Sequence, residues 1–263
     1  MAKALPKPNL TAGSLYSQSA RLIFQRHRSL IIQPILILAL SAGLAFTLSR
    51  AHLDVIEKVT INKAFIFRAI QDHLILSFAS AAVILAVAVP AGILLTRRRY
   101  KKFTPVVLIL ANIGQAFPAV GVLIIAGILF GFGKPIAIFS FAAFGILPIL
   151  RNTIVGLQEI DPFIIESAMG MGMTPKQALR QIELPLAVPV ILAGVRTTLI
   201  LTVGVATLGV FVNGGGLGTL IIPGLKLNRE LVLVTGGMLT VIVAFTMDWL
   251  ARAAEELLRP RGI

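Results

Sequence analysis

Long uncharged stretches dominate this chain of 263 residues. Residues 30–49, 74–96 and 103–133 contain no Asp, Glu, Lys or Arg. Three further apolar runs carry one charge each: 135–158 with Arg151, 184–212 with Arg196, and 231–250 with Asp248. A helix needs about 20 apolar residues to cross the roughly 30 Å hydrocarbon core of a bilayer. The six runs therefore predict an all-α membrane protein with six transmembrane helices.

The composition agrees with this fold class. Charged residues make up 13% of the chain, which is about half the share found in an average soluble domain. A transmembrane β-barrel would show segments of about ten residues with alternating hydrophobicity, and the Leu-, Ile-, Ala- and Val-rich runs lack that period. We therefore favour a helical bundle over a barrel.

The basic residues are distributed as in a membrane protein. The formal net charge is +13, with 24 Lys and Arg residues, which raises the question of nucleic-acid binding. If the amino terminus lies inside, most of these residues, including the block RRRYKK at 97–102, fall on the cytoplasmic side. This is the positive-inside pattern. We predict contact with a lipid bilayer and no nucleic-acid partner, with both termini in the cytoplasm.

The first 72 residues differ from the rest of the chain. Residues 1–28 are predicted to be a cytoplasmic tail, in which 14–28 suit either an interfacial helix or a solvated leader. The apolar run that follows is longer than a typical signal peptide, so we expect a retained first span and an outer loop within 29–72. Residues 73–257 would form the main transmembrane domain, and 258–263 a second cytoplasmic tail.

One polar segment, EIDPFIIESAMGMGMTPKQALRQIELP at 159–185, lies between two apolar runs. Asp161-Pro162 and Thr174-Pro175 each predict a helix start, because Asp and Thr cap free N–H groups and proline suits the first helical turn. Gln177 stands three residues after Thr174, which is the spacing of a capping box. The segment therefore predicts two short helices, at about 162–169 and 175–183.

Glycines divide these two short helices. Gly170 and Gly172 can adopt the left-handed conformation that ends a helix. Each helix has one apolar stripe to bury: Ile164, Ile165, Ala168 and Met169 on the first, and Ala178, Leu179 and Ile182 on the second. Neither helix is long enough to be stable alone in water. We expect either a protein contact surface or an interfacial loop lying on the bilayer.

The spacing resembles the EAA loop of permease subunits in bacterial ATP-binding-cassette importers. That loop reads Glu-Ala-Ala, three residues, Gly, nine residues, Ile, one residue, Leu-Pro. Here Glu166-Ser167-Ala168 is followed at the same intervals by Gly172, Ile182 and Leu184-Pro185, with Ser167 as the one departure. The stretches ILPILRNTIVGLQEIDP, ELPLAVPVILAGVRTT and VNGGGLGTLIIPGL resemble the branch that imports osmoprotectants such as glycine betaine, choline and carnitine. Methionine-importer permeases share the loop and a similar Gly-rich stretch.

This resemblance implies a type I permease core of five helices within 73–257, preceded by an added N-terminal helix. It implies a bacterial cytoplasmic-membrane location and a second permease subunit, either a copy of this chain or a homologue. Two cytoplasmic ATPase subunits would bind ATP and Mg, and an external binding protein would deliver the substrate. We expect no catalytic residue, cofactor or metal in this chain. The implied ATPase-coupling residues are Glu166, Ser167, Ala168, Gly172, Ile182, Leu184 and Pro185.

Polar residues at membrane depth are candidates for a translocation path, because they are costly in lipid. The candidates are Asn112, Gln115, Pro118, Asn152, Arg196 and Thr202. Hydrogen bonding between helices, or snorkelling, explains each of them equally well. Pro118 is expected to bend the third span, and Asp248 to pair with Arg252 one turn further on.

Other functions remain open at this point. The chain could be a permease for methionine or another amino acid, or an ATPase-independent channel or ion-coupled transporter. The EAA spacing favours the importer, because a channel has no need of an ATPase-docking loop. The glycine run at 214–218 follows an apolar stretch on the predicted outer side, so flexible backbone or close packing explains it better than phosphate binding.

Overall fold

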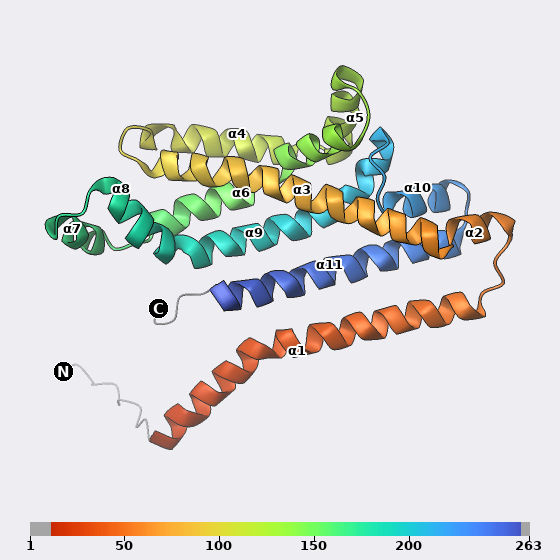
Figure 1. Cartoon of the computed structure of the whole chain (residues 1–263), viewed down its shortest axis with the longest axis horizontal. Coiled ribbons are helices and arrows are strands. Elements are labelled where there is room, and N and C mark those ends of the chain that lie inside the picture. The colour runs from red at the N-terminus through yellow and green to blue at the C-terminus, as the bar shows by residue number, and fades with distance from the viewer. Residues whose placement is uncertain (1–11, 259–263) are drawn as a thin grey trace, which may run out of the picture.

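The computed structural model describes the backbone of residues 12–258 and the side chains of residues 30–257. This part of the chain contains helices and no β-strand (Figure 1). The long helices are α1 (Ala12–Arg50), α3 (Lys63–Thr96), α6 (Lys134–Gln158), α9 (Leu184–Ala206) and α11 (Glu230–Leu258). They lie roughly along one direction, the longest axis of the molecule (Figure 1). The predicted ends of the two tails, 1–11 and 259–263, lie outside the described residues.

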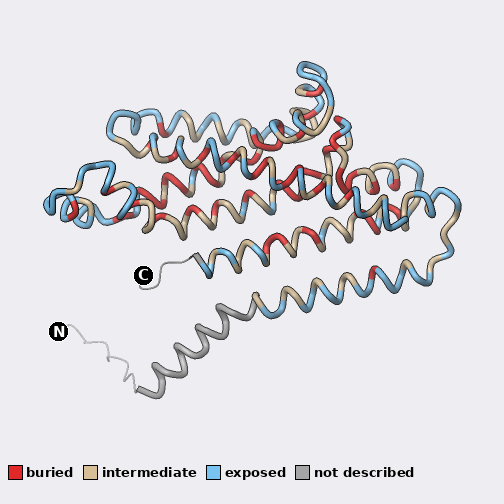
Figure 2. Tube along the Cα trace, in the orientation of Figure 1, coloured by how far each residue is buried: buried red, intermediate tan, exposed pale blue. Residues whose placement is uncertain are grey.

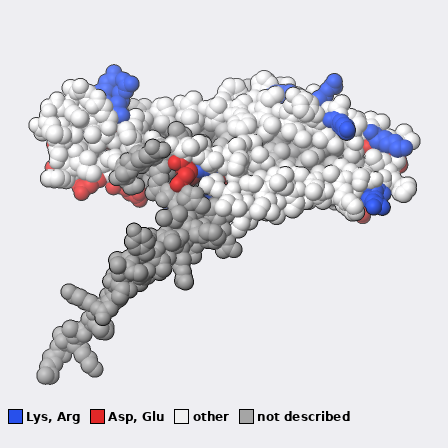
Figure 3. Space-filling view, turned by 60° about the horizontal axis from the view of Figure 1, so that its bottom comes forward, with Lys and Arg blue, Asp and Glu red and all other residues white. Residues whose placement is uncertain are grey.

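The membrane-spanning capacity agrees with the prediction. Five helices in the described part are long and apolar enough to cross a membrane. The number becomes six if the bent pair α4 (Thr104–Ala116) and α5 (Ala119–Phe130) counts as one span. On the face drawn in Figure 3, Lys and Arg gather near the two ends of the molecule and most of the long side between them is uncharged. An uncharged belt between charged ends suits a bilayer.

The third predicted run is broken rather than straight. Helices α4 and α5 meet at 92°, with Phe117 and Pro118 between them. Proline has no N–H to donate and disfavours the helical conformation in the residue before it. Phe117 accordingly has an extended backbone, with φ −66° and ψ 143°. The bend predicted at Pro118 is confirmed, and it separates two short helices.

The two ends of the bundle carry different short elements (Figure 1). We call one the loop end, where η1 (Lys101–Phe103), α7 (Pro162–Gly170) and α8 (Pro175–Ala178) lie. The other is the glycine end, with α2 (Val55–Thr60), η3 (Thr207–Val212) and α10 (Gly218–Lys226). Here α3 begins at Lys63, well before the apolar run at 74, because the Asn62 side chain accepts a hydrogen bond from the Phe65 N–H and caps the helix.

Helix α1 is loosely attached to the rest of the bundle. Its backbone is helical without interruption from Ala12 to Arg50, so the helix expected at 14–28 is not a separate element. It packs along α11, and most of its described side chains remain half-exposed or exposed (Figure 2). The exposed side chains include Ile31, Ile35 and Leu38. Such an apolar surface suits lipid contact.

The best-buried helices are α3, α6 and α9, which pack against one another (Figure 2). Leu76 and Ile84 of α3, Phe141 and Ile149 of α6, and Val203 of α9 are all at most 1% exposed. Each of these helices is apolar around most of its circumference, as a helix buried among others must be. This three-helix core holds the polar 159–185 segment at the loop end.

Candidate functional site

The first short helix of the 159–185 segment forms as its sequence predicts. Helix α7 begins at Pro162 after Asp161, whose Oδ1 accepts a hydrogen bond of 2.9 Å from the Phe163 N–H. Proline at the first helical position costs nothing there, because that N–H has no partner within a helix. The Asp161-Pro162 start is therefore confirmed.

A glycine bend ends α7. The Gly172 N–H donates to the Met169 carbonyl at 3.0 Å, and the Met173 N–H donates to the Ala168 carbonyl at 3.1 Å. These two bonds make a Schellman motif, which needs a left-handed residue after the helix. Gly172 supplies it with φ +93°, and nothing lies within 4 Å of the position that a Cβ would take there. The left-handed role predicted for Gly170 is wrong, since that residue remains inside α7.

The second short helix starts as predicted and then differs. The Thr174 side chain accepts from the Gln177 N–H, and Gln177 Oε1 accepts from the Thr174 N–H at 2.9 Å, which confirms the capping box. The helix expected at 175–183 does not end at 183. Helix α8 (Pro175–Ala178) continues through a π-helical turn, η2 (Leu179–Glu183), directly into α9.

This continuity corrects the expected separate helix at 175–183, and Pro185 explains it. Proline has no N–H for the carbonyl one turn earlier. A π turn, closed here by the Leu184 N–H bonding the Leu179 carbonyl, shifts the hydrogen-bond register just before Pro185. The chain is therefore one continuous helical rod from Pro175 to Val212.

One side of the segment is anchored on the bundle. Ala168 of α7 and Ala178 of α8 are 2% and 1% exposed. Ile165 and Leu179 pack against a buried cluster at the ends of α6 and α9, which consists of Leu157, Ile160, Ala187 and Ile191. Ile164 and Met169 stay exposed, so the predicted stripe on α7 is only partly buried, because α7 meets the bundle along one edge.

The other side of the segment is open. Glu166 and Ser167 are exposed, as are Phe163 and Met171. An open hollow of about 620 Å³ lies over the start of α8 and η2, lined by Thr174, Lys176, Gln177, Arg180 and Gln181. Of the other motif positions, Ile182, Leu184 and Pro185 are half-buried where the segment joins α9. The segment thus presents an exposed surface of mixed polar and apolar side chains on a firmly anchored base.

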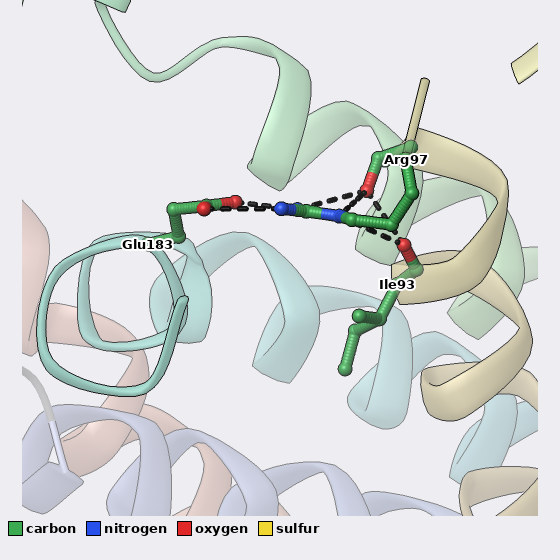
Figure 4. Close-up of polar contacts among 4 residues, drawn as sticks. Ile93, Arg97 and Glu183 are labelled. Carbon is green, nitrogen blue, oxygen red and sulfur yellow. Dashed lines mark hydrogen bonds and ion pairs between the residues drawn. The ribbon is translucent and has the colours of Figure 1, made fainter. Parts of the chain in front are cut away.

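An ion pair that sequence reasoning missed ties this segment to α3 (Figure 4). Arg97 Nη1 donates to Glu183 Oε1 at 3.1 Å, and Nη2 donates to Oε2 at 2.5 Å. Glu183 is 4% exposed. A carboxylate between the apolar Ile182 and Leu184 was the available signal, since a buried Glu is almost always paired.

The six candidate path residues lie on three helices, α4, α6 and α9, and at the bend after α4. Asn112, Gln115 and Pro118 lie on α4 and at its bend, with Asn112 and Pro118 exposed. The Asn112 amide donates to the Leu108 carbonyl one turn earlier. These positions leave their role in a path as a prediction.

The other three candidates make internal hydrogen bonds. The Asn152 amide of α6 donates to the Val190 carbonyl of α9 at 3.1 Å, which joins two core helices. Thr202 is buried and donates to the Leu199 carbonyl. Arg196 Nε donates to Asp248 Oδ1 at 2.5 Å. All three are hydrogen-bonded within the bundle, and their role in a translocation path stays a prediction.

Asp248 is the centre of a polar network between three helices. It pairs with Arg252 at 3.1 Å, as predicted, and with Arg196 of α9. Its Oδ2 also accepts from the Gln33 amide of α1 at 2.5 Å. The Trp249 indole N–H donates to the Leu30 carbonyl at 3.0 Å. These bonds fasten α1 to α11.

The glycine-rich stretch at 213–218 packs closely against the bundle at the glycine end. The Leu217 N–H donates to His73 Nδ1 of α3 at 3.3 Å. A Cβ on Gly218 would lie 1.8 Å from the Thr207 carbonyl oxygen. The structure therefore supports close packing as the explanation for this glycine run.

Solved structures share this fold. The chain matches a chain of the MetNI methionine ABC transporter, solved in inward-facing conformations, with a TM-score of 0.64 at 23% identity over 76% of this chain and 100% of that chain. It also matches a bacterial alginate ABC transporter, with a TM-score of 0.59 at 19% identity over 95% and 96% of the two chains. At these identities the likeness shows the fold.

Sequence relatives are closer. The choline transport system permease protein OpuBB of Bacillus subtilis is 36% identical over 209 residues, 80% of this chain and 95% of the relative. The osmoprotectant import permease protein OsmY of Salmonella typhimurium is 40% identical over 193 residues, 73% and 82% of the two chains. Residues 88–260 match the family model described as binding-protein-dependent transport system inner membrane component. The chain belongs to this family of ABC-transporter permeases.

Proposed function

We propose that this chain is the permease subunit of an ATP-driven importer that carries a small quaternary-amine osmoprotectant. The observation that carries the proposal is the 159–185 segment, in which the EAA spacing coincides with an anchored helix, bend and helix whose outer surface is exposed. A channel working alone would gain nothing from such a surface. A cytoplasmic ATPase subunit is the partner it would receive.

The substrate class follows the relatives. Those at 33% to 40% identity have names that refer to choline, carnitine, glycine betaine or osmoprotectants. The methionine transporter is similar at 23% identity. We therefore favour a quaternary amine over methionine as the solute.

The coupling mechanism uses the two sides of the segment differently. Its anchored side, through Ala168 and the continuous rod from α8 into α9, would carry movement into the bundle. Its exposed side, with Glu166 and Ser167, would contact an ATPase that binds ATP. Since a partner shifts an equilibrium only by binding two states unequally, this surface must fit the ATPase better in one state of the permease.

Topology and assembly complete the proposal. The basic residues near the loop end support a cytoplasmic location for that end and for both termini. A second permease subunit, two ATPase subunits and an external binding protein would form the working complex. ATP and Mg would bind the ATPase subunits.

Variants of the exposed surface and the bend test this function. In a complex reconstituted in vesicles with its ATPase and binding protein, Glu166→Ala and Gly172→Leu should lower glycine betaine uptake by about fivefold or more, the range of energetic coupling between sites. Leucine at Gly172 is strained because φ is +93°. Uptake and ATP hydrolysis are measured together.

Gly170→Ala is the matched control. Gly170 lies inside α7 with nothing within 4 Å of an added Cβ, so alanine fits there and favours the helix. This variant should transport like the parental complex. Normal coupled uptake by both Glu166→Ala and Gly172→Leu would contradict the role of the segment.

A further inference from the structure

We propose that Arg97 and Glu183 are positioning residues that pass movement of the 159–185 segment to α3, so that α3 and α9 move together at the loop end. This inference rests on the proposed function and adds a link that the EAA pattern does not contain. Neither residue is among the solute path candidates or the matched positions of the EAA pattern.

Arg97 is fixed on its own helix. It follows the last residue of α3, and its Nε donates to the Ile93 carbonyl at 3.3 Å and to Thr96 Oγ1 at 3.2 Å (Figure 4). The Ile93 carbonyl also accepts from Thr96 Oγ1 at 2.8 Å, so Arg97 and Thr96 together cap the last turn of α3, where carbonyls lack backbone partners. The positive charge also suits the negative end of the helix dipole. The guanidinium is therefore held by α3 before it meets Glu183.

Glu183 is fixed on the other side. Its side chain is 5% exposed, whereas that of Arg97 is 34% exposed. Both carboxylate oxygens accept from the guanidinium, in the two-bond geometry that gives arginine and carboxylate pairs directional strength. Glu183 is also the last residue of the π turn. The pair thus holds the point at which the segment becomes α9.

The polar contact between α3 and the segment is concentrated in this pair. Among the described residues, the side-chain hydrogen bonds between the end of α3 and 159–185 are the two from Arg97 to Glu183. The pair lies on the wall of an open hollow of about 560 Å³, whose lining includes Arg97, Lys101, Gln158, Ile165, Glu166 and Glu183. Apolar contacts made by Ile93 and Val89 can slide, while a two-bond ion pair resists sliding.

The test separates coupling from stability. The double variant Arg97→Gln/Glu183→Gln removes both charges and leaves no buried carboxylate without a partner. In the full reconstituted complex with glycine betaine as the probe, ATP hydrolysis should continue, and solute imported per ATP hydrolysed should fall by about fivefold or more. The pair Arg98→Gln/Glu230→Gln, two exposed residues outside 159–185, makes the same change of charge and should keep the parental ratio.

A conservative variant keeps the test decisive if the double variant does not assemble. Arg97→Lys retains the charge but lacks the planar fork of donors with which Arg97 bonds both carboxylate oxygens and the end of α3. Its ratio should also fall, with a normal yield of complex. A parental ratio in Arg97→Gln/Glu183→Gln, or in Arg97→Lys, overturns the inference alone. Loss of ATP-dependent uptake in the parental complex would overturn the proposed function as well.

Discussion

Asp248→Ala should destabilise the chain by about 3 to 5 kcal/mol, the cost of breaking a buried ion pair from one side. Asp248 is 8% exposed and lies in a helix that can span a membrane. Its two carboxylate oxygens accept hydrogen bonds from Arg196, Arg252 and Gln33. Alanine would leave the Arg196 guanidinium without this counter-charge, in surroundings that hydrate it poorly.

The same variant should loosen α1. Gln33 would lose its hydrogen bond to Asp248. Among the described side chains, the hydrogen bond from Trp249 to the Leu30 carbonyl would then remain between α1 and α11. Thermal unfolding in detergent measures the loss of stability, and hydrogen exchange across 30–50 measures the release of α1. Glu230→Ala, at an exposed position in the first turn of α11, is the control and should change neither. A melting temperature of Asp248→Ala equal to that of the parental chain would refute this account of the network.

Gly218→Ala should cost about 3 kcal/mol, at the upper end of what overpacking costs. The added Cβ would lie 1.8 Å from the Thr207 carbonyl oxygen and 2.8 Å from its carbon. These are backbone atoms, so no side chain can rotate away, and η3 and α10 would have to separate. The expected result is a lower melting temperature and a poor yield of folded chain.

Gly237→Ala serves as the comparison for this change. Gly237 lies in α11 with nothing within 4 Å of an added Cβ, and alanine is the better helix former by about 1 kcal/mol. It should be neutral or slightly stabilising. Equal melting temperatures of the Gly218→Ala and Gly237→Ala variants would show that the glycine run is not required for packing.

Local sequence signals predicted much of the fold. The uncharged runs identified the spanning helices, and Pro118 identified the bend, because these features depend on composition and on one residue. Asp161, Thr174 and Gln177 identified the short helices, because a cap bonds within a few residues of its own position. Each of these signals lies within the element that it predicts.

The interactions between distant residues could not be predicted in the same way. Arg97 and Glu183 are 86 positions apart, and Gln33 and Asp248 are 215 apart. No periodicity connects such pairs. The size of the bend at Pro118 and the continuation of α8 into α9 also depend on packing in the folded bundle, so the second short helix does not end near 183 as expected. For the candidate site, the sequence indicated the exposed motif, and the structure added its anchorage.

Solute uptake into vesicles with and without the ATPase tests the central claim most directly. The chain and its binding protein are reconstituted with radiolabelled glycine betaine, and the ATPase subunit and ATP are then added separately and together. The account predicts accumulation only when the ATPase and ATP are both present. Accumulation by the chain without the ATPase would contradict it and would indicate a channel or an ion-coupled transporter.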